Sequence, residues 1–325
     1  MKYLMEKIMK NVIEKNTDRT RTIKELENLS PEERATYFQS LKNHCANNIK
    51  KKSFNSFTRR IVFLLGLIMR KYELEVRGAE NIPKSDEAIF VCNHSNSHDF
   101  FTLTEVFTRL HIRVTPLAAS DGLNCISKLL FHMGNITFLR RGDKESQKEG
   151  EYILCNRLLN GISVIIYAES TWNLHPINAM LPIKAGPVEI ALITEKKIVP
   201  TIFEYIEVEH ECRKESELYR KCVVCFGKPI TVSMEEGIFK QADNIQKKME
   251  EMRQSLWDEF GIKRKELSDI DKNVYLNHLH LKKNKAIGFR YVSEHESLFI
   301  RRINGKYENE YYVNEEGEFV SRIYL

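Results

Sequence analysis

Short apolar runs alternate with longer helix-like runs over most of this chain, and that alternation restricts the possible folds more than any other feature. The apolar runs have the length and composition of strands and lie at 74–76, 88–92, 113–118, 136–139, 163–167, 198–203 and 222–226. The helix-like runs that separate most of them lie at 100–110, 122–132, 144–159 and 187–194. This alternation predicts an α/β fold, with a mostly parallel sheet covered on its faces by helices.

The two ends of the chain differ from this middle part. The first seventy residues are polar and helical in character, and Ser30-Pro31-Glu32-Glu33 is a capping box that predicts a helix to about residue 50. A charged amphipathic helix is expected at 235–260. Strand-like runs separated by turn signals follow at 286–293, 297–303, 306–313 and 318–325. We predict three parts: an N-terminal helical segment (1–74), an α/β domain (75–262) and a small C-terminal antiparallel β extension (263–325).

A basic window covers residues 42–71, which contain eight lysines and arginines and no acidic residue. The apolar run 61–69 inside it is too short to cross a bilayer, which takes about 20 residues. An apolar helix flanked by cations suits the surface of a membrane with anionic lipid. A buried core helix with a solvated basic flank is the alternative. Nucleic acid is not expected as a partner, because the apolar run interrupts the basic residues and no aromatic residues alternate with them.

The cysteines and the N-terminal sequence bear on the cell compartment. The seven cysteines are an odd, scattered set, which is typical of reduced thiols. Cys222 and Cys225 lie in a strand-like run and should face opposite sides, so we expect no metal site there. The first residues lack the apolar core of a secretory signal, and a cytoplasmic location is expected.

A histidine and an aspartate with four residues between them follow the apolar run 88–92. His94 should lie on the turn after this strand and Asp99 at the start of the next helix. A carboxylate on one ring nitrogen holds the imidazole so that the other can accept a proton from a hydroxyl group. In the alternative interpretation, Asp99 only caps the helix and His94 is an ordinary loop residue.

Further polar residues follow other strands, at the sheet edge where ligands of α/β proteins bind. Arg140 and Arg141 end the run that begins at Gly134, and guanidinium groups suit phosphate or carboxylate. The run 167–173 leaves the most apolar strand and includes Glu169. Val199-Pro200 lies near the start of a further strand.

In this order, the blocks resemble those of the lysophospholipid, or glycerolphosphate, acyltransferases over roughly residues 75–232. The matched positions are Asn93, His94 and Asp99 in the first block, Gly134, Ile136 and Arg140 in the second, Tyr167 to Asn173 in the third, Lys184 and Gly186 after it, and Val199-Pro200 in the fourth. We therefore expect 75–262 to be an acyltransferase domain. The basic window with its apolar run makes 1–74 the expected membrane-surface segment.

The resemblance implies transfer of a fatty acyl group to a hydroxyl of a lysophospholipid or glycerol-phosphate-like acceptor. His94 would be the general base and Asp99 its orienting carboxylate, while the acceptor would be bound by Arg140, Glu169, Ser170, Thr171 and Lys184. The donor would be acyl-CoA or acyl-carrier protein, with no metal and no further cofactor. The enzyme would work as a peripheral protein at the cytoplasmic face of the membrane. Arg140 and Lys184 also fit plain surface charges, and Glu169 fits a helix-capping acid.

The third block departs from the family pattern. Where the family has proline, glycine and arginine, this chain has Ala168, Ser170 and Trp172. A serine narrows the space that glycine leaves for a ligand, and the lost arginine removes one anion-binding group. Acceptors other than phosphatidate precursors, such as an amino-lipid or a glycan, therefore stay open. So does a membrane-bound protein of this family that has lost turnover.

Overall fold

The structure is a computed structural model. It describes residues 23, 25–49, 56–69, 72–84, 86–94, 99–120, 135–140, 143–169, 179–180, 182–208, 219–262, 287–291, 297–303, 306–313 and 319–321. The expected helix at 122–132 and the turns at 304–305 and 314–317 lie outside the described residues.

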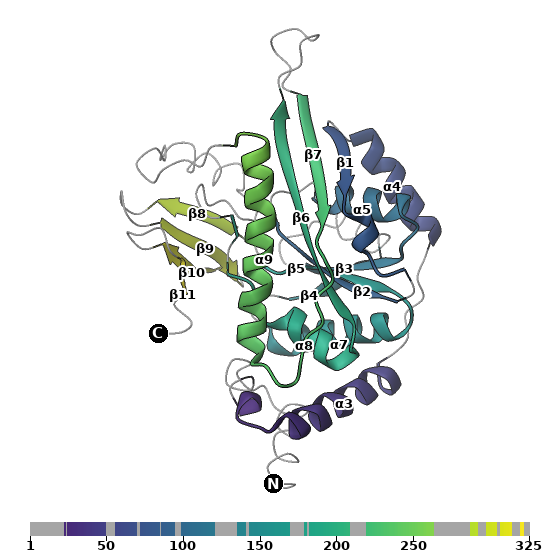
Figure 1. The fold of residues 1–325 in the computed structure, drawn as a ribbon, viewed down its shortest axis with the longest axis vertical. Coiled ribbons are helices and arrows are strands. Elements are labelled where there is room, and N and C mark those ends of the chain that lie inside the picture. The colour runs from purple at the N-terminus through teal and green to yellow at the C-terminus, as the bar shows by residue number, and fades with distance from the viewer. Residues whose placement is uncertain are drawn as a thin grey trace.

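A twisted sheet forms the centre of the molecule (Figure 1). Within the described residues it has seven strands: β1 (Tyr72–Arg77), β2 (Ala88–Cys92), β3 (Val114–Ala119), β4 (Thr137–Leu139), β5 (Ser163–Tyr167), β6 (Lys197–Val208) and β7 (Tyr219–Phe226). Their order is β1-β7-β6-β2-β5-β3-β4. Neighbouring strands run parallel except β6 and β7, which are antiparallel. The predicted α/β fold with a mostly parallel sheet is therefore confirmed.

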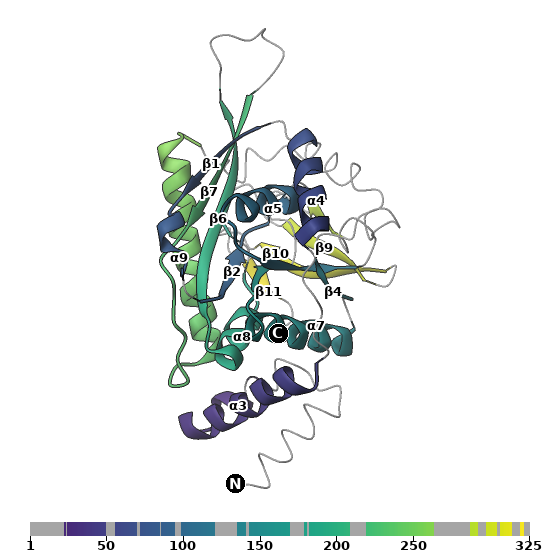
Figure 2. The ribbon, with the colours of Figure 1, turned by 90° about the vertical axis from the view of Figure 1, so that its right-hand side faces the viewer.

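Helices cover both faces of this sheet (Figure 2). The helices are α3 (Pro31–Asn47), α4 (Ser56–Met69), α5 (Asp99–Arg109), α7 (Lys144–Leu159), α8 (Gly186–Thr194) and α9 (Ile238–Glu259), with a short 3-10 turn η1 (Ala79–Asn81). Of these, α3 packs on α7 and α8, and α4 packs on α5. The capping box predicted at the start of α3 is present. The Ser30 side chain accepts from the Glu33 N–H, and the Glu33 carboxylate accepts from the Ser30 N–H.

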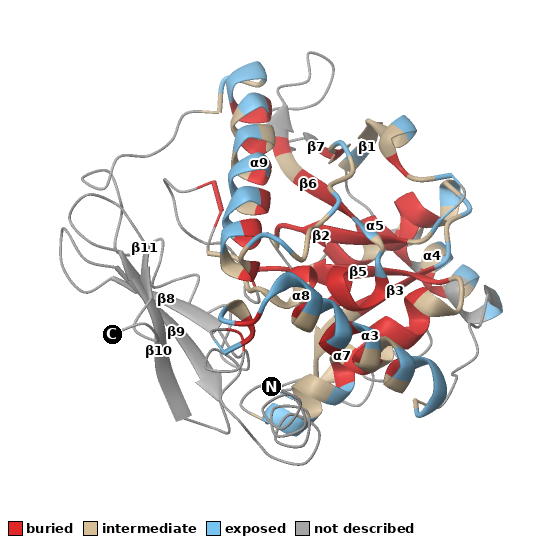
Figure 3. Cartoon of the chain, turned by 60° about the horizontal axis from the view of Figure 1, so that its bottom comes forward, coloured by how far each residue is buried: buried red, intermediate tan, exposed pale blue. Residues whose placement is uncertain are grey.

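The two faces of the sheet bury separate apolar cores. Ile89 and Val91 pack on the face that carries α3, α7, α8 and α9, whereas Phe90 and Cys92 pack on the face that carries α5. This division follows from the alternation of side chains along a strand. Figure 3 shows buried residues along the strands and on the side of α9 that faces them. Cys222 and Cys225 contact opposite cores, as predicted from their spacing.

Helix α4 packs on α5 by one side only. Val62 is buried against Phe100, and a Cβ atom added at Gly66 would lie 3.5 Å from the Phe101 side chain. On the other side Phe57 is 72% exposed and Leu64 is 56% exposed. The helix is therefore not a fully buried core helix. Among the helices in the described part of the chain, none is both long and apolar enough to cross a bilayer.

A second sheet lies in the C-terminal part of the chain. It has four antiparallel strands within the described residues, in the order β11-β10-β9-β8. They are β8 (Ile287–Tyr291), β9 (Ser297–Ile303), β10 (Lys306–Val313) and β11 (Phe319–Ser321). Each falls within one of the predicted strand-like runs, in the consecutive pairing of a meander.

Candidate active site

The candidate site lies at the carboxyl ends of the parallel strands β2 and β5. Asn93, directly after β2, is fully buried and makes two hydrogen bonds to the backbone of β6. Its amide nitrogen donates to the Phe203 carbonyl at 2.9 Å, and its amide oxygen accepts from the Phe203 N–H at 3.0 Å. These bonds continue the β2–β6 contact beyond the last paired residues and fix the start of the turn that carries His94.

His94 and Asp99 form the contact expected from their spacing. Asp99 is the first residue of α5 and is fully buried, and its Oδ2 lies 2.7 Å from His94 Nδ1. The His94 side chain is 21% exposed. An ionised carboxylate only accepts hydrogen bonds, so it holds the proton of a neutral imidazole on Nδ1 and leaves the lone pair on Nε2. This is the tautomer that a general base acting through Nε2 requires.

Glu169 meets His94 from the end of β5. Its side chain is fully buried, and its Oε2 accepts from the His94 backbone N–H at 2.8 Å. The preceding residue, Ala168, donates its N–H to the Cys92 carbonyl at 3.2 Å and accepts from the Lys184 N–H at 3.1 Å. The structure therefore brings His94, Asp99 and Glu169 together and places the Lys184 backbone beside the same turn.

An aromatic ring supports the imidazole. The rings of Tyr167 and His94 are stacked, with centroids 4.4 Å apart and an interplanar angle of 28°. Burial, and after it the charge of Asp99, raises the pKa of Tyr167 well above its usual range. Burial likewise raises the pKa of the neighbouring Cys92 thiol. Both groups therefore stay protonated near neutral pH, and Cys92 lacks the thiolate character of a nucleophile.

The other predicted binding residues differ in how close they lie to His94. Arg140 follows β4, is exposed, and donates its backbone N–H to Ser146 Oγ at 2.9 Å. β4 is three strands from β2, which corresponds to about 14 Å across the sheet. Arg140 is thus at the same edge as His94 without adjoining it. Lys184 is half-buried. Ser170 and Thr171 lie outside the described residues.

Several residues around the site were not predicted to have a role of their own. The stacking of Tyr167, the two hydrogen bonds of Asn93 and a buried pair formed by Glu204 and Arg253 all depend on contacts between distant parts of the chain. A signal existed for the pair, since an acidic residue directly follows the apolar run that ends at Phe203. Nothing in the sequence alone indicates its partner.

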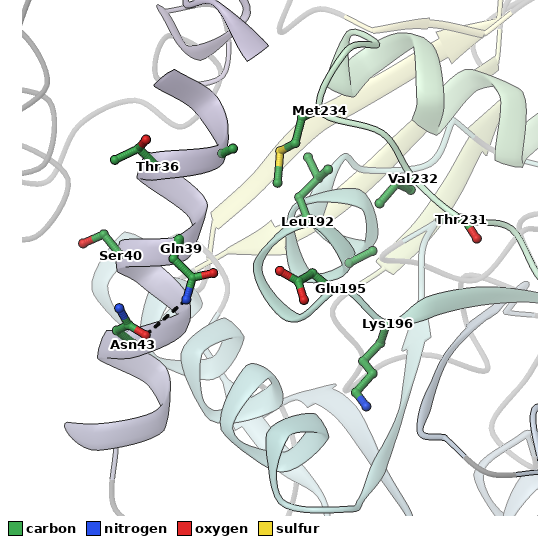
Figure 4. A pocket seen from close by; sticks show the side chains of 12 residues that line it. Thr36, Gln39, Ser40, Asn43, Leu192, Glu195, Lys196, Thr231, Val232 and Met234 are labelled. Atoms are coloured by element: carbon green, nitrogen blue, oxygen red, sulfur yellow. Dashed lines mark hydrogen bonds between the residues drawn. The ribbon is translucent and has the colours of Figure 1, made fainter. Parts of the chain in front are cut away.

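The described residues hold no cluster of metal ligands, and a cavity among them lies away from His94. Within the described ranges, no group of three or more His, Cys, Asp or Glu side chains is arranged to hold a metal ion. A cavity of about 820 Å³ lies between α3 and the end of α8 (Figure 4), where Gln39 and Asn43 face Leu192 and Met234. Its lining residue Lys196 precedes the first residue of β6. The cavity is therefore at the opposite edge of the sheet from His94.

Part of this chain is similar to known acyltransferases. Residues 73–204 match the family model "Acyltransferase". The chain is 30% identical over 150 residues to 1-acyl-sn-glycerol-3-phosphate acyltransferase alpha of Homo sapiens, covering 44% of this chain and 49% of that protein. For the same protein of Bos taurus the identity is 30% over 150 residues, covering 44% and 48%.

The match therefore spans about half the length of these curated relatives. Among solved structures, the 1-acyl-sn-glycerophosphate (LPA) acyltransferase PlsC from Thermotoga maritima aligns with a TM-score of 0.40 and 17% identity, over 77% of this chain and 89% of that one. The family match at residues 73–204 includes β2, β5 and the residues His94, Asp99 and Glu169. Residues 73–204 of this chain therefore match the acyltransferase family.

Proposed function

We propose that this chain is an O-acyltransferase that moves a fatty acyl group from a thioester donor, acyl-CoA or acyl-carrier protein, to a hydroxyl of a lysophospholipid or glycerol-phosphate-like acceptor. The observation that supports this most is the 2.7 Å contact between His94 Nδ1 and Asp99 Oδ2, at a sheet edge where Glu169 accepts from the His94 backbone. The human and bovine relatives are named as 1-acyl-sn-glycerol-3-phosphate acyltransferases, and these names support the same reaction class.

In the proposed reaction His94 carries the proton, and no covalent enzyme intermediate forms. His94 accepts the acceptor's hydroxyl proton on Nε2 as the oxygen attacks the thioester carbonyl. The C–O bond forms, the C–S bond breaks, and the imidazolium returns its proton to the departing thiolate. Asp99 stabilises the imidazolium while it exists. Help of this kind typically contributes about 10²–10⁴ in rate.

The acceptor would be bound by groups on both sides of His94. Glu169 is placed to orient the turn that carries His94, and Ser170 and Thr171 follow it in sequence. Arg140 and Lys184 supply cations for an acceptor phosphate. With Arg140 about three strands away, its contact would be to the distal end of the acceptor rather than to the reacting hydroxyl.

The membrane surface is part of the proposal. Phe57 and Leu64 are exposed seven positions apart on α4, so they share one side of the helix, and exposed Arg60 lies between them in sequence. Apolar side chains beside a cation suit the interface of a bilayer that contains anionic lipid. We propose peripheral attachment through α4, at the cytoplasmic face, where the acyl donors would be available.

The altered third block favours a second acceptor class within the same reaction. Trp172 stands where the family has an arginine, so the site has one cation fewer and one aromatic face more. This change suits an acceptor with less negative charge, such as an amino-lipid or a glycan hydroxyl.

The test is a transfer assay with the purified chain. Palmitoyl-CoA or palmitoyl-acyl-carrier protein is incubated with lysophosphatidic acid, lysophosphatidylcholine, glycerol 3-phosphate, an amino-lipid and a glycolipid, and free thiol and acylated product are both measured. We expect release with at least one acceptor, and its loss in His94→Ala. The matched control is His111→Asn, an exposed histidine at positive φ that asparagine tolerates. Absence of transfer from either donor to every acceptor would support the alternative of a family member without turnover.

A further inference from the structure

A buried arginine on α9 lies outside the residues that match the family model. Arg253 is 6% exposed. It lies on α9, which begins 34 residues after the family match ends. Arginine is almost never buried without partners, because an unpaired buried charge costs far more than a buried neutral group. α9 runs along β6 (Figure 1), so its inner side faces the strand that Asn93 holds next to the His94 turn.

Arg253 contacts two separate parts of the domain. Its Nε donates to Glu204 Oε2 at 2.5 Å, and Glu204 directly follows the Phe203 backbone held by Asn93. Its Nη1 donates to the Ala179 carbonyl. Its guanidinium carbon lies 5.0 Å from the Trp257 ring centroid, and Trp257 Nε1 donates to the same Glu204 oxygen at 3.1 Å. The planar guanidinium thus joins β6 to the segment at 179–184.

The Glu169 turn, formed by Ala168 and Glu169 after β5, lies beside residues 179–180 and 182–184. Ala179 and Met180 are buried, and Lys184 donates its N–H to Ala168, the residue before Glu169. A second α9 side chain contacts this segment, since Gln246 accepts from the Ile183 N–H at 3.1 Å. Gln246 and Arg253 are seven positions apart and lie on the same side of the helix. Two residues of α9 therefore contact the segment beside Glu169.

The charge of Arg253 also acts on the site. Burial lowers its pKa, but the charge and hydrogen bond of Glu204, followed by the charges of Glu169 and Asp99, raise it, and the net pKa is above its usual value. The guanidinium therefore stays charged and lies within the electrostatic field of both site carboxylates. It is a buried counter-charge for three carboxylates that are themselves wholly or mostly buried.

We propose that Arg253 is a positioning residue for acyl transfer: by joining Glu204 to Ala179 it holds the Glu169 turn, and through that turn the backbone of His94. This inference rests on the function proposed above. Arg253 contacts Glu204, Ala179 and Trp257, and no role at the reacting atoms is assigned to it. Its effect passes through Glu169 and is expected in the rate of the chemical step rather than in binding of the acyl donor.

The test compares three variants of the full-length chain. Arg253→Met removes the charge and both hydrogen bonds at similar volume, and Arg253→Lys keeps the charge without the planar fork. Arg34→Met is the matched control, since Arg34 is also buried and also donates to a backbone carbonyl, that of Glu236. For Arg253→Met we expect kcat to fall about tenfold or more, because small misplacements of reacting groups are costly, while the KM for palmitoyl-CoA stays within about twofold. Arg253→Lys should recover part of the loss, and Arg34→Met should keep the wild-type kcat.

Hydrogen exchange gives a measurement that does not depend on activity. In Arg253→Met, we expect amide exchange to become about tenfold faster in peptides that contain Ala168 and Lys184, with peptides from α7 unchanged. If the single variant does not fold, Arg253→Met with Glu204→Gln removes both charges and is examined instead. Unchanged exchange at 168–184, or equal kcat in the Arg253→Met and Arg34→Met variants, would overturn the inference. A wild type without transfer activity would refute the proposed function, and the exchange data would still decide whether Arg253 holds the turn.

Discussion

The carboxylate of Glu169 accepts a hydrogen bond from the backbone N–H of His94 at 2.8 Å, across the ends of two neighbouring parallel strands. A backbone N–H donated to a buried carboxylate is a strong, charge-assisted bond. It fixes the main chain at the residue whose side chain faces Asp99, so the orientation of the imidazole is determined from both sides. A carboxylate that looks in sequence like a substrate ligand thus already has a role within the protein.

Two replacements of Glu169 test its hydrogen bond with the His94 backbone. In Glu169→Gln the amide oxygen can still accept from the His94 N–H, so we expect a loss of about 1 kcal/mol or less in the free energy of unfolding. In Glu169→Ala the buried N–H loses this acceptor, which costs about 1–3 kcal/mol. Urea unfolding of both variants measures the difference. Equal stability of the two would contradict the assigned role of the hydrogen bond.

Asp99→Asn tests the tautomer of His94. The asparagine amide can donate to Nδ1, which moves the ring proton to Nε2 and removes the base from the position that faces the acceptor. We expect kcat to fall about 10²–10⁴-fold with the fold retained, measured by palmitoyl transfer and by circular dichroism. Asp86→Asn is the control, because Asp86 pairs with Lys196 at the other edge of the sheet. A kcat within about threefold of the wild type would argue against His94 as the base.

Local sequence signals were enough for the main elements and for the contact between His94 and Asp99. The apolar run 163–167 became β5 with the predicted ends, and 144–159 became α7 with Asp143 as its N-cap. A strand, a turn and a helix start lie close together along the chain, so a spacing of five positions was sufficient to predict that His94 meets Asp99.

Contacts between segments far apart in the sequence could not be predicted from such local signals. β6 continues to Val208, five residues beyond the predicted run, because its later residues pair with the antiparallel β7. The partner of Glu204 lies 49 positions away on α9. Such a contact depends on how α9 packs on β6, and no local propensity encodes that packing. The three-part division at residues 74 and 262 stays a prediction.

The free energy of unfolding at acidic pH should depend on Glu75. Hydrogen bonds to Lys221 and then to Arg77 lower the pKa of this carboxyl below its usual value of about 4.3. A carboxyl with a lowered folded-state pKa contributes stability that is complete above its unfolded pKa and is lost as the pH falls through the folded value. Glu75 is 30% exposed, so we expect Glu75→Gln to cost about 1 kcal/mol or less at pH 7.

That cost should shrink steadily below about pH 4.3. Urea unfolding of the wild type and of Glu75→Gln at pH 7, 5 and 3.5 measures the trend. A difference that stays constant or grows toward low pH would show that the ion pairs of Glu75 do not stabilise the folded state.

Helix α4 offers the sharpest test of the membrane proposal, because its buried and exposed sides can be changed independently. Phe57 and Leu64 face away from α5, so their replacement should leave the fold intact. Burying one such side chain in an apolar phase is worth about 1.5–3 kcal/mol. Even partial burial predicts that Phe57→Ser with Leu64→Ser weakens binding to vesicles of phosphatidylcholine and 30% phosphatidylserine at least about tenfold, at an unchanged melting temperature.

Arg60→Gln should weaken binding less, by about 1 kcal/mol, and only at low salt. Gln39→Ser, at an exposed position of α3, is the control for a surface change elsewhere. Unaltered sedimentation of the double variant with these vesicles would show that α4 is not the attachment surface, and the exposed apolar side chains would then need a protein partner.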